Sequence, residues 1–183
     1  MANYGLAYPT IAKLDVQTGT YSKGFHCGKA VSTDITPNYN EGQIYGDNEL
    51  AEYAKEFKDA DVNLNVTVLP IDAADTVFGH TVSAEDNTIT YNAEDSANYV
   101  GYGFYANEMV NNKKSFVAVV LPKVKFTEAA ESYTTKGDSL EFKSPNISGK
   151  AYPDNSLNWK YRQVFATAAE AQAWIDEKLG ITA

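Results

Sequence analysis

The sequence is short of positive charge, cysteine and long apolar runs. Its 15 lysines and arginines stand against 24 aspartates and glutamates, which gives a formal net charge of −9. Such a surface repels nucleic acid on average, because phosphate binding depends on clustered basic side chains. Cys27 has no partner for an intramolecular disulfide, and the longest apolar run, Phe116 to Leu121, is far too short to cross a bilayer. These absences argue against a DNA-binding protein and against a membrane protein.

The first residues, MANYGLAYPTI, lack the charged region and the long apolar region of an export signal. Because the chain also has only one cysteine, we expect it to fold in a reducing cytoplasm. Motifs for catalysis are equally scarce. His26, Cys27 and His80 do not form a zinc-binding spacing, and the adjacent His26 and Cys27 would point to opposite faces of a strand. We therefore interpret these three residues as structural, and expect no enzyme activity, no metal and no cofactor.

One segment, Gly101 to Ala106 (GYGFYA), does fit the dinucleotide-binding pattern G-x-G-x-x-G/A. That pattern binds phosphate where a buried strand precedes it and a helix follows, so that the amides of the helix N-terminus point at the ligand. Here the preceding residues, 92–98, are polar, and the residues that follow enter a hairpin pattern. The segment is therefore predicted to be a β-strand whose glycines make room for aromatic neighbours.

The chain is rich in tyrosine, with 13 residues, and in β-strand patterns. Apolar and polar residues alternate from Val62 to Leu69, after a turn predicted at Asp59–Asp61. The pattern from Val100 to Phe126 predicts a hairpin that turns at Asn111–Asn112, with Pro122 at an edge or a bulge. Further strands are predicted to begin at Leu140 and Phe142, before Pro145, and to span Asn158 to Phe165.

Two helices are predicted. Residues 72–78 form a short one, capped by Asp72 with Asp75 in the capping-box position and closed by Gly79. Residues 168–179 form the stronger one, because Thr167 and Glu170 make a capping box. Its apolar stripe, which we expect to dock on a sheet, consists of Ala171, Trp174, Ile175 and Leu179. The whole predicts a single domain, residues 1–183, that is mainly antiparallel β with flanking helices.

Residues 37–61 concentrate the negative charge. They carry seven acids and two lysines, a local balance of −5. A run of acids is usually a solvated surface. Here, however, apolar side chains are interleaved with the acids, which suggests a contact surface. These side chains are Tyr39, Ile44, Tyr45, Leu50, Tyr53 and Phe57.

The same segment fails as a calcium loop. If Gly46 takes the obligatory sixth position, Glu52 falls correctly at the twelfth, but Tyr45 at the fifth offers no carboxylate or amide ligand. The conformation of residues 47–58 stays open, because their apolar positions fit either a helix or one face of a strand. The segment can therefore be an extended arm, within about residues 37–61, or contain a short helix.

Several short motifs occur in a characteristic order along nearly the whole chain. They are YGLAYPTIAKL, ITPNYNEGQIYGDNELAE, the region from Phe57 to Leu69 taken as a hairpin, VFGHTV, NYVGYGFY, LPKVKFTEAAESYTTKGDSLEFKSPNISGKA and FATAAEAQAWIDEKLG. In this combination the sequence resembles the major tail proteins of long-tailed, non-contractile phages and prophages of Gram-positive bacteria. It departs from that pattern at Asp59–Asp61, where a glycine-like turn is expected.

The resemblance implies a tail-tube fold, an antiparallel β-sandwich or partly rolled barrel with a flanking C-terminal helix. It implies a virion protein that assembles in the host cytoplasm into hexameric rings, which stack into a hollow tube for DNA ejection. A tape-measure protein would fill the lumen and a tail terminator would cap it, while DNA passes without specific binding. With such a tube in view, we hypothesise that Glu41 to Phe57 form an arm between neighbouring subunits, on or near the lumen. The candidate subunit-interface or lumen residues are Glu41, Tyr45, Asp47, Glu49, Glu52, Tyr53 and Phe57.

Two other functions remain as alternatives. The first is a non-catalytic ligand- or carbohydrate-binding β-sandwich that presents tyrosine and tryptophan platforms. Such modules usually work outside the cell, and no export signal is recognised in this sequence. The second, which the residues support least, is a small cytosolic enzyme with scattered carboxylates.

Overall fold

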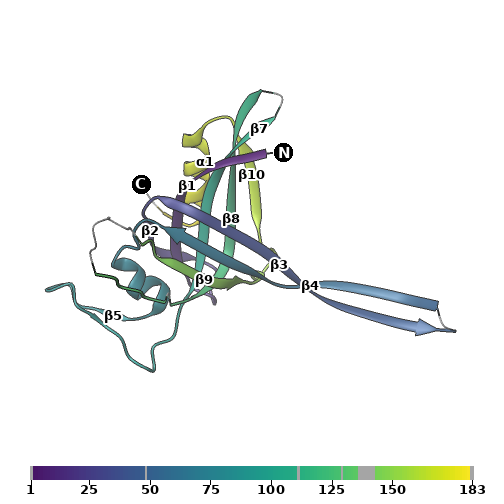
Figure 1. The fold of residues 1–183 in the computed structure, drawn as a ribbon, viewed down its shortest axis with the longest axis horizontal. Coiled ribbons are helices and arrows are strands. Elements are labelled where there is room, and N and C mark those ends of the chain that lie inside the picture. Colours follow the sequence, from purple (N-terminus) through teal and green to yellow (C-terminus); the bar gives the residue numbers. More distant parts are fainter. Residues whose placement is uncertain (1, 48, 111, 129, 136–142, 182–183) are drawn as a thin grey trace.

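The computed structural model describes residues 2–47, 49–110, 112–128, 130–135 and 143–181. Across these ranges the protein is mainly β, with antiparallel strands and a C-terminal helix (Figure 1). Its elements are β1 (Ala2–Leu14), β2 (Tyr21–His26), β3 (Ala30–Gly46), β4 (Glu49–Val66), the π-helical turn η1 (Ala74–Phe78), β5 (Thr81–Val82), β6 (Ile89–Thr90), β7 (Tyr99–Val110), β8 (Lys113–Thr127), β9 (Asn146–Ala151), β10 (Tyr161–Phe165) and α1 (Ala168–Lys178).

The main sheet runs in the order β2-β1-β7-β8-β9-β4-β3, and β10 also pairs with β8. Strand β8 therefore changes its neighbour along its length, pairing first with β10 through Val120 and then with β9 from Val124. Pro122 lies at this change, where a bulge shifts the register against β7. Because proline has no N–H to donate, it fits where ladder bonding is interrupted. The prediction of a bulge at Pro122 is confirmed.

The hairpin of β7 and β8 agrees with its sequence pattern. Val110 pairs with Lys113, which leaves a two-residue connection. Asn112 has a φ of 61°, a backbone conformation that asparagine adopts more readily than most residues. Asn111 lies outside the described residues. Gly101 to Ala106 lie inside β7, so this segment is a strand and not a phosphate-binding loop.

The main core lies where the two halves of the sheet curve toward each other. Val62, Leu64 and Val66 of β4 are buried, as their alternation with polar residues predicts. They belong to one cluster with Tyr102 of β7 and Phe126 of β8. The hydroxyl of Tyr102 donates to Thr33 Oγ1 at 3.1 Å, which links β7 to β3 across the interior. The alternation ends at Val66, and Val68 is exposed, because the strand does not continue to Leu69.

A second core forms where α1 docks on the sheet. Its predicted capping box is present, with the Thr167 side chain accepting from the Glu170 amide and the Glu170 carboxylate accepting from the Thr167 amide. Ile175 is fully buried against β8 and β7. A Cβ on Gly103 would lie 2.7 Å from Ile175 Cγ2, so this glycine makes room for the helix. A Cβ on Gly101 would lie 2.6 Å from Cε1 of the Tyr21 ring, so this glycine makes room for an aromatic neighbour, as predicted. The helix ends at Lys178, one residue earlier than predicted.

Other predictions need correction or fall outside the described residues. The short helix starts at Ala74, and no side chain caps it, because its N-cap residue is Ala73 rather than Asp72. Gly79 does close it, with a φ of 76°. The strand predicted from Asn158 begins only at Tyr161. The strand predicted at Leu140 and Phe142 lies outside the described residues. Among the described residues, no helix is both long and apolar enough to cross a membrane.

The capping box should contribute measurably to stability. Replacing Thr167 with alanine removes the acceptor for the Glu170 amide and should lower the free energy of unfolding by about 1 kcal/mol. Urea unfolding followed by circular dichroism measures this difference. Thr167→Ser keeps a hydroxyl at the cap and should stay within a few tenths of a kcal/mol of the unchanged protein. Equal losses in both variants would contradict the role assigned to the cap.

Candidate assembly interface

The outer part of the β3–β4 hairpin projects from the body as a two-stranded ribbon (Figure 1). The two strands pair from Ala30 with Val66 to Gly46 with Glu49, whereas β9 pairs with β4 only between Ala60 and Asn65. We call residues 39–57 the arm. Because its described part is strand, the helical interpretation of residues 47–58 is wrong. The hairpin turns beyond Gly46, at Asp47, and not between Phe57 and Leu69.

The cross-strand register gives the arm two chemically different faces. Residues directly opposite each other in an antiparallel pair share a face, and neighbours along a strand alternate. The aromatic face carries Tyr39, Glu41, Gln43, Tyr45, Leu50, Tyr53, Lys55 and Phe57. The acidic face carries Asn40, Gly42, Ile44, Glu49, Glu52, Ala54 and Glu56. A bulge opposite Ile44 and Tyr45 puts Leu50, rather than Ala51, across from Tyr45.

The aromatic face is ordered by its own contacts. The Lys55 ammonium lies 2.7 Å from Glu41 Oε1 and 4.6 Å from the centre of the Tyr39 ring. The hydrogen bond from Lys55 holds the pKa of Glu41 below its usual value. Tyr45 donates its hydroxyl to Gln43 at 3.0 Å. Tyr45 and Leu50 are nevertheless 64% and 51% exposed, so the end of this face is an apolar surface without cover in the single chain.

The acidic face is open to solvent. Glu49, Glu52 and Glu56 all lie on it and are exposed. Ile44, on the same face, is 61% exposed, and a side chain added at Gly42 would meet no atom within 4 Å. This face therefore presents three carboxylates of like charge around a small apolar centre. It can meet water or a basic surface at low cost, but it would repel phosphate.

The root of the arm is fixed by a cluster of four polar residues, which we call the root cluster: Asn38, Asp59, Asp61 and Lys150. The Asn38 side-chain amide donates to Asp59 Oδ1 at 2.7 Å and to Asp61 Oδ2 at 2.8 Å. The Lys150 ammonium lies 3.1 Å from Asp59 Oδ1 and 3.0 Å from Asp61 Oδ1. The hydrogen bonds from Asn38, followed by those from Lys150, lower the pKa of both carboxyls.

The predicted turn at Asp59–Asp61 is therefore wrong. These residues continue β4, where Asp59 pairs with Asn38 and Asp61 pairs with Thr36. Two aspartates disfavour a strand when they stand alone, because their side chains compete for nearby backbone amides. Here Asn38 and Lys150 bind both carboxylates, so the strand continues from the body into the arm.

The aromatic face joins the body through stacked rings. Phe57 stacks on Trp159 with ring centres 4.7 Å apart and an interplanar angle of 16°. Tyr39 meets the edge of Phe57 at 6.1 Å. The second tryptophan, Trp174, packs 5.9 Å from Phe165 on the other side of the molecule. Both tryptophans are thus used in internal packing, which leaves neither as an open platform for a sugar ring.

The seven candidate residues all lie on the arm, but on different faces of it. Glu41, Tyr45, Tyr53 and Phe57 share the aromatic face, and Glu49 and Glu52 share the acidic face. Asp47 is at the turn with a φ of 52°. Sequence reasoning missed Lys55 and Glu56, and it named Leu50 among the apolar side chains of a contact surface without placing it in the list of candidates. Strand alternation could have added Lys55 and Glu56 to the candidates, because they fall on the same faces as Tyr53 and Glu52. The face of Leu50 could not be predicted in this way, because it is set by the bulge.

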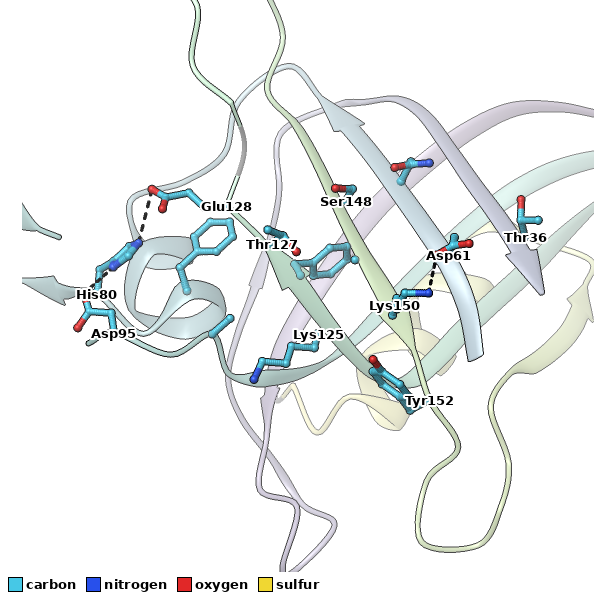
Figure 2. A pocket seen from close by; sticks show the side chains of 15 residues that line it. Thr36, Asp61, His80, Asp95, Lys125, Thr127, Glu128, Ser148, Lys150 and Tyr152 are labelled. Carbon is cyan, nitrogen blue, oxygen red and sulfur yellow. Dashed lines mark hydrogen bonds and ion pairs between the residues drawn. The ribbon is translucent and has the colours of Figure 1, made fainter. Parts of the chain in front are cut away.

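A polar cleft of about 840 Å³ lies beside the root cluster and is the place to look for a catalytic site (Figure 2). At one end Lys150 pairs with Asp61. At the other end His80 Nδ1 lies 2.7 Å from Asp95 Oδ2, and its Nε2 lies 3.6 Å from Glu128 Oε1. The His80 side chain is only 8% exposed and its ring lies 4.4 Å from that of Tyr91.

The geometry of this cleft fits a structural role for His80. In a nucleophilic triad, the histidine nitrogen opposite the acid accepts the proton of a hydroxyl or thiol within hydrogen-bond reach. Here that nitrogen faces a second carboxylate instead. Burial raises the pKa of the Cys27 thiol to about 12, so it stays protonated near neutral pH. In the described part of the chain, no group of three or more potential ligands has metal-binding geometry.

The root cluster should make stability depend on acid pH. The lowered pKa values of Asp59 and Asp61 mean that their contribution is complete above the ordinary value of 3.8 and is lost as the pH falls through the lowered values. Lys150→Met should therefore lower the free energy of unfolding at neutral pH. This difference from the unchanged protein should shrink in acid, as measured by urea unfolding across that pH range.

Lys125→Met is the matched control, because Lys125 lies directly opposite Lys150 on the neighbouring strand. Lys125 contacts the Tyr99 ring, 5.4 Å away, rather than a carboxylate. Its replacement should therefore not produce the acid-dependent loss. A Lys150→Met difference that persists unchanged in acid would contradict the assignment.

Comparison with known proteins leaves the function to be argued from the molecule itself. No family model matches the chain, and no curated protein matches it. The arm and its two faces, together with the resemblance in the sequence, are therefore the basis for a functional proposal.

Proposed function

We propose that the protein is a structural subunit that polymerises with copies of itself, and that the polymer is a phage tail tube. The observation that carries the proposal is the arm, a ribbon that is fixed at its root and exposes apolar side chains at its end. Tyrosine and leucine held on such a ribbon lose their contact with water only when another surface covers them. A second copy of the chain is the partner that we assign to that surface.

An arm that reaches a different surface of the next subunit makes a heterologous contact. Such contacts close into rings or continue as open polymers, depending on the rotation between subunits. This property fits a tube built of stacked rings. The hexameric order, the tape-measure protein in the lumen and the terminator at the end are proposed from the resemblance to major tail proteins. The same resemblance is the basis for proposing that the fold is a tail-tube sandwich or partly rolled barrel, and that the protein is located in the virion tail.

The charge of the chain suits a conduit for DNA. The whole chain has a net charge of −9, and the acidic face of the arm carries three exposed carboxylates, so the protein offers little attraction to a passing phosphate backbone. We propose that the aromatic face and the end of the arm make the contact between subunits, and that the rest of the acidic face, with Glu52 and Glu56, points toward solvent or lumen. In this arrangement DNA slides without specific binding, and the protein acts without catalysis.

The carbohydrate-binding alternative has less support. It needs an aromatic ring whose open face can stack on a sugar. The two tryptophans pack against Phe57 and Phe165, and the ring of Trp159 also carries the ammonium of Lys160 at 4.5 Å. The exposed tyrosines of the arm lie on a projecting ribbon rather than in a cleft. A convex ribbon of this kind suits protein contacts better than sugar binding.

Assembly should depend on the aromatic end of the arm. We expect the purified protein to form rings or tubes at high concentration, visible by electron microscopy and sedimentation. Tyr45→Ser together with Leu50→Ser should shift it to monomers, because the buried apolar area of the contact is lost. Circular dichroism and the unfolding midpoint should stay unchanged, since both side chains are exposed in the single chain.

The control replaces two equally exposed apolar residues away from the arm. Tyr133 is 86% exposed and Leu157 is 83% exposed, so Tyr133→Ser with Leu157→Ser removes comparable surface. This variant should assemble like the unchanged protein. Tubes formed equally well by the arm variant would contradict the proposal, and a strict monomer that binds a sugar tightly would favour the carbohydrate-binding alternative.

A further inference from the structure

A groove on the body of the protein is left unfilled by the described part of the chain. Its volume is about 520 Å³, and it lies between the start of β3 and the face of the β1-β7-β8 sheet that is opposite α1. Leu6, Phe104, Val117 and Val119 form its apolar floor. At its rim, Tyr4 and Val31 are 44% and 53% exposed. Phe104 and Val117 are only 7% and 2% exposed, so the uncovered apolar surface of the groove comes from the half-buried Leu6 and Val119 and from the rim. Exposed apolar surface of this kind is typical of a docking site.

The register explains why this face is apolar. Phe104 pairs with Val119, and Leu6 pairs with Ala106, which in turn pairs with Val117. These residues therefore line one face, while Gly103 and Val120 on the opposite face contact α1. The start of β3 covers one side of the first face, and the other side remains open as the groove.

The rim beside β10 is basic. Lys160 and Arg162 line the groove there, and both are exposed. Arg162 Nη2 lies 3.7 Å from Oε1 of the buried Glu108, which is too long for a hydrogen bond. Within the described residues, Glu108 is the carboxylate partner of Arg162, and the Lys160 ammonium lies over the Trp159 ring rather than beside a carboxylate. Two cations next to an apolar floor are a specific feature in a chain whose net charge is −9.

We infer that this groove binds the end of the arm from a second copy of the chain, an assignment that rests on the proposed function. Tyr45 and Leu50 are paired across the end of the arm and are exposed, so they can enter the apolar floor. Asp47 and Glu49 flank them, which brings two carboxylates to Lys160 and Arg162. The volume of the groove suits these few side chains rather than the whole ribbon.

The occupant belongs to another subunit because the arm leaves its own body. The ribbon continues β3 and β4 outward, and its end lies far from the rest of the molecule (Figure 1). The root cluster and the Phe57–Trp159 stack hold it in that direction. Insertion of the arm of one subunit into the groove of the next joins two different surfaces. The contact repeats from copy to copy, as polymer growth requires.

Charge reversal with rescue tests this assignment. Asp47→Lys with Glu49→Lys should lower the amount of polymer at least about tenfold, because like charges would meet at the groove rim. Lys160→Glu with Arg162→Glu should have the same effect. The four substitutions together in one chain should restore assembly, since the charges are then exchanged but still complementary. Lys13→Glu with Lys143→Glu, neither of which lines the groove, changes the net charge by the same amount as the Lys160 and Arg162 variant and should assemble normally.

A further variant separates docking from folding, because reversal at Arg162 also affects the buried Glu108. Val31→Glu puts a carboxylate at the exposed rim without touching that pair, and it should block assembly while the unfolding midpoint stays unchanged. If the Tyr45 and Leu50 variant loses assembly but the groove variants do not, or if the four-fold exchange keeps its unfolding midpoint yet fails to restore assembly, the groove assignment is wrong and the proposed function stands. An unchanged protein that never assembles would overturn both.

Discussion

The joint that fixes the arm to the body is the constraint on which the rest of the account depends. A two-stranded hairpin is marginally stable in water, and in the described chain residues 39–57 have no further strand beside them. At the root, Asn38 and Lys150 bind Asp59 and Asp61, while Phe57 stacks on Trp159. The polar contacts thus join the two strands of the ribbon to the body at its root, and the stacked rings join its aromatic face to the body. As a result the arm presents its faces in one orientation rather than as a flexible tail.

Strand β4 runs from the solvent around the arm into the core of the body. From Ala60 to Val66 its alternate side chains are aliphatic and fill the core, whereas between Glu49 and Glu56 the side chains that meet solvent include Leu50, Tyr53 and three glutamates. Tyrosine suits the second environment because its ring is apolar and its hydroxyl stays hydrated until a partner arrives. Binding at the end of the arm would therefore act on a strand that is continuous with the core. In the proposed polymer, this continuity would make the arm a mechanical link between the cores of neighbouring subunits.

Local sequence patterns were sufficient to predict much of the body, and long-range contacts explain the predictions that were wrong. The alternation from Val62 to Val66 and the capping box of Thr167 involve near neighbours, so the sequence predicts them. The turn predicted at Asp59–Asp61 fails because the compensating Lys150 is 91 residues away from Asp59. The candidate residues of the arm were found by composition, but sorting them into two faces needs the register. In particular, the bulge that brings Leu50 opposite Tyr45 has no recognisable sequence signal.

The central claim is that the arm is a contact between copies of this chain. Hydrogen–deuterium exchange of residues 39–57, compared between the monomeric and the assembled protein, tests it most directly. In the monomer, the outward-facing amides of this ribbon should exchange fast, because no other strand covers its edges. The account predicts strong protection of these amides on assembly, together with protection of the groove beside β10. Assembled particles in which residues 39–57 exchange as fast as in the monomer would contradict it.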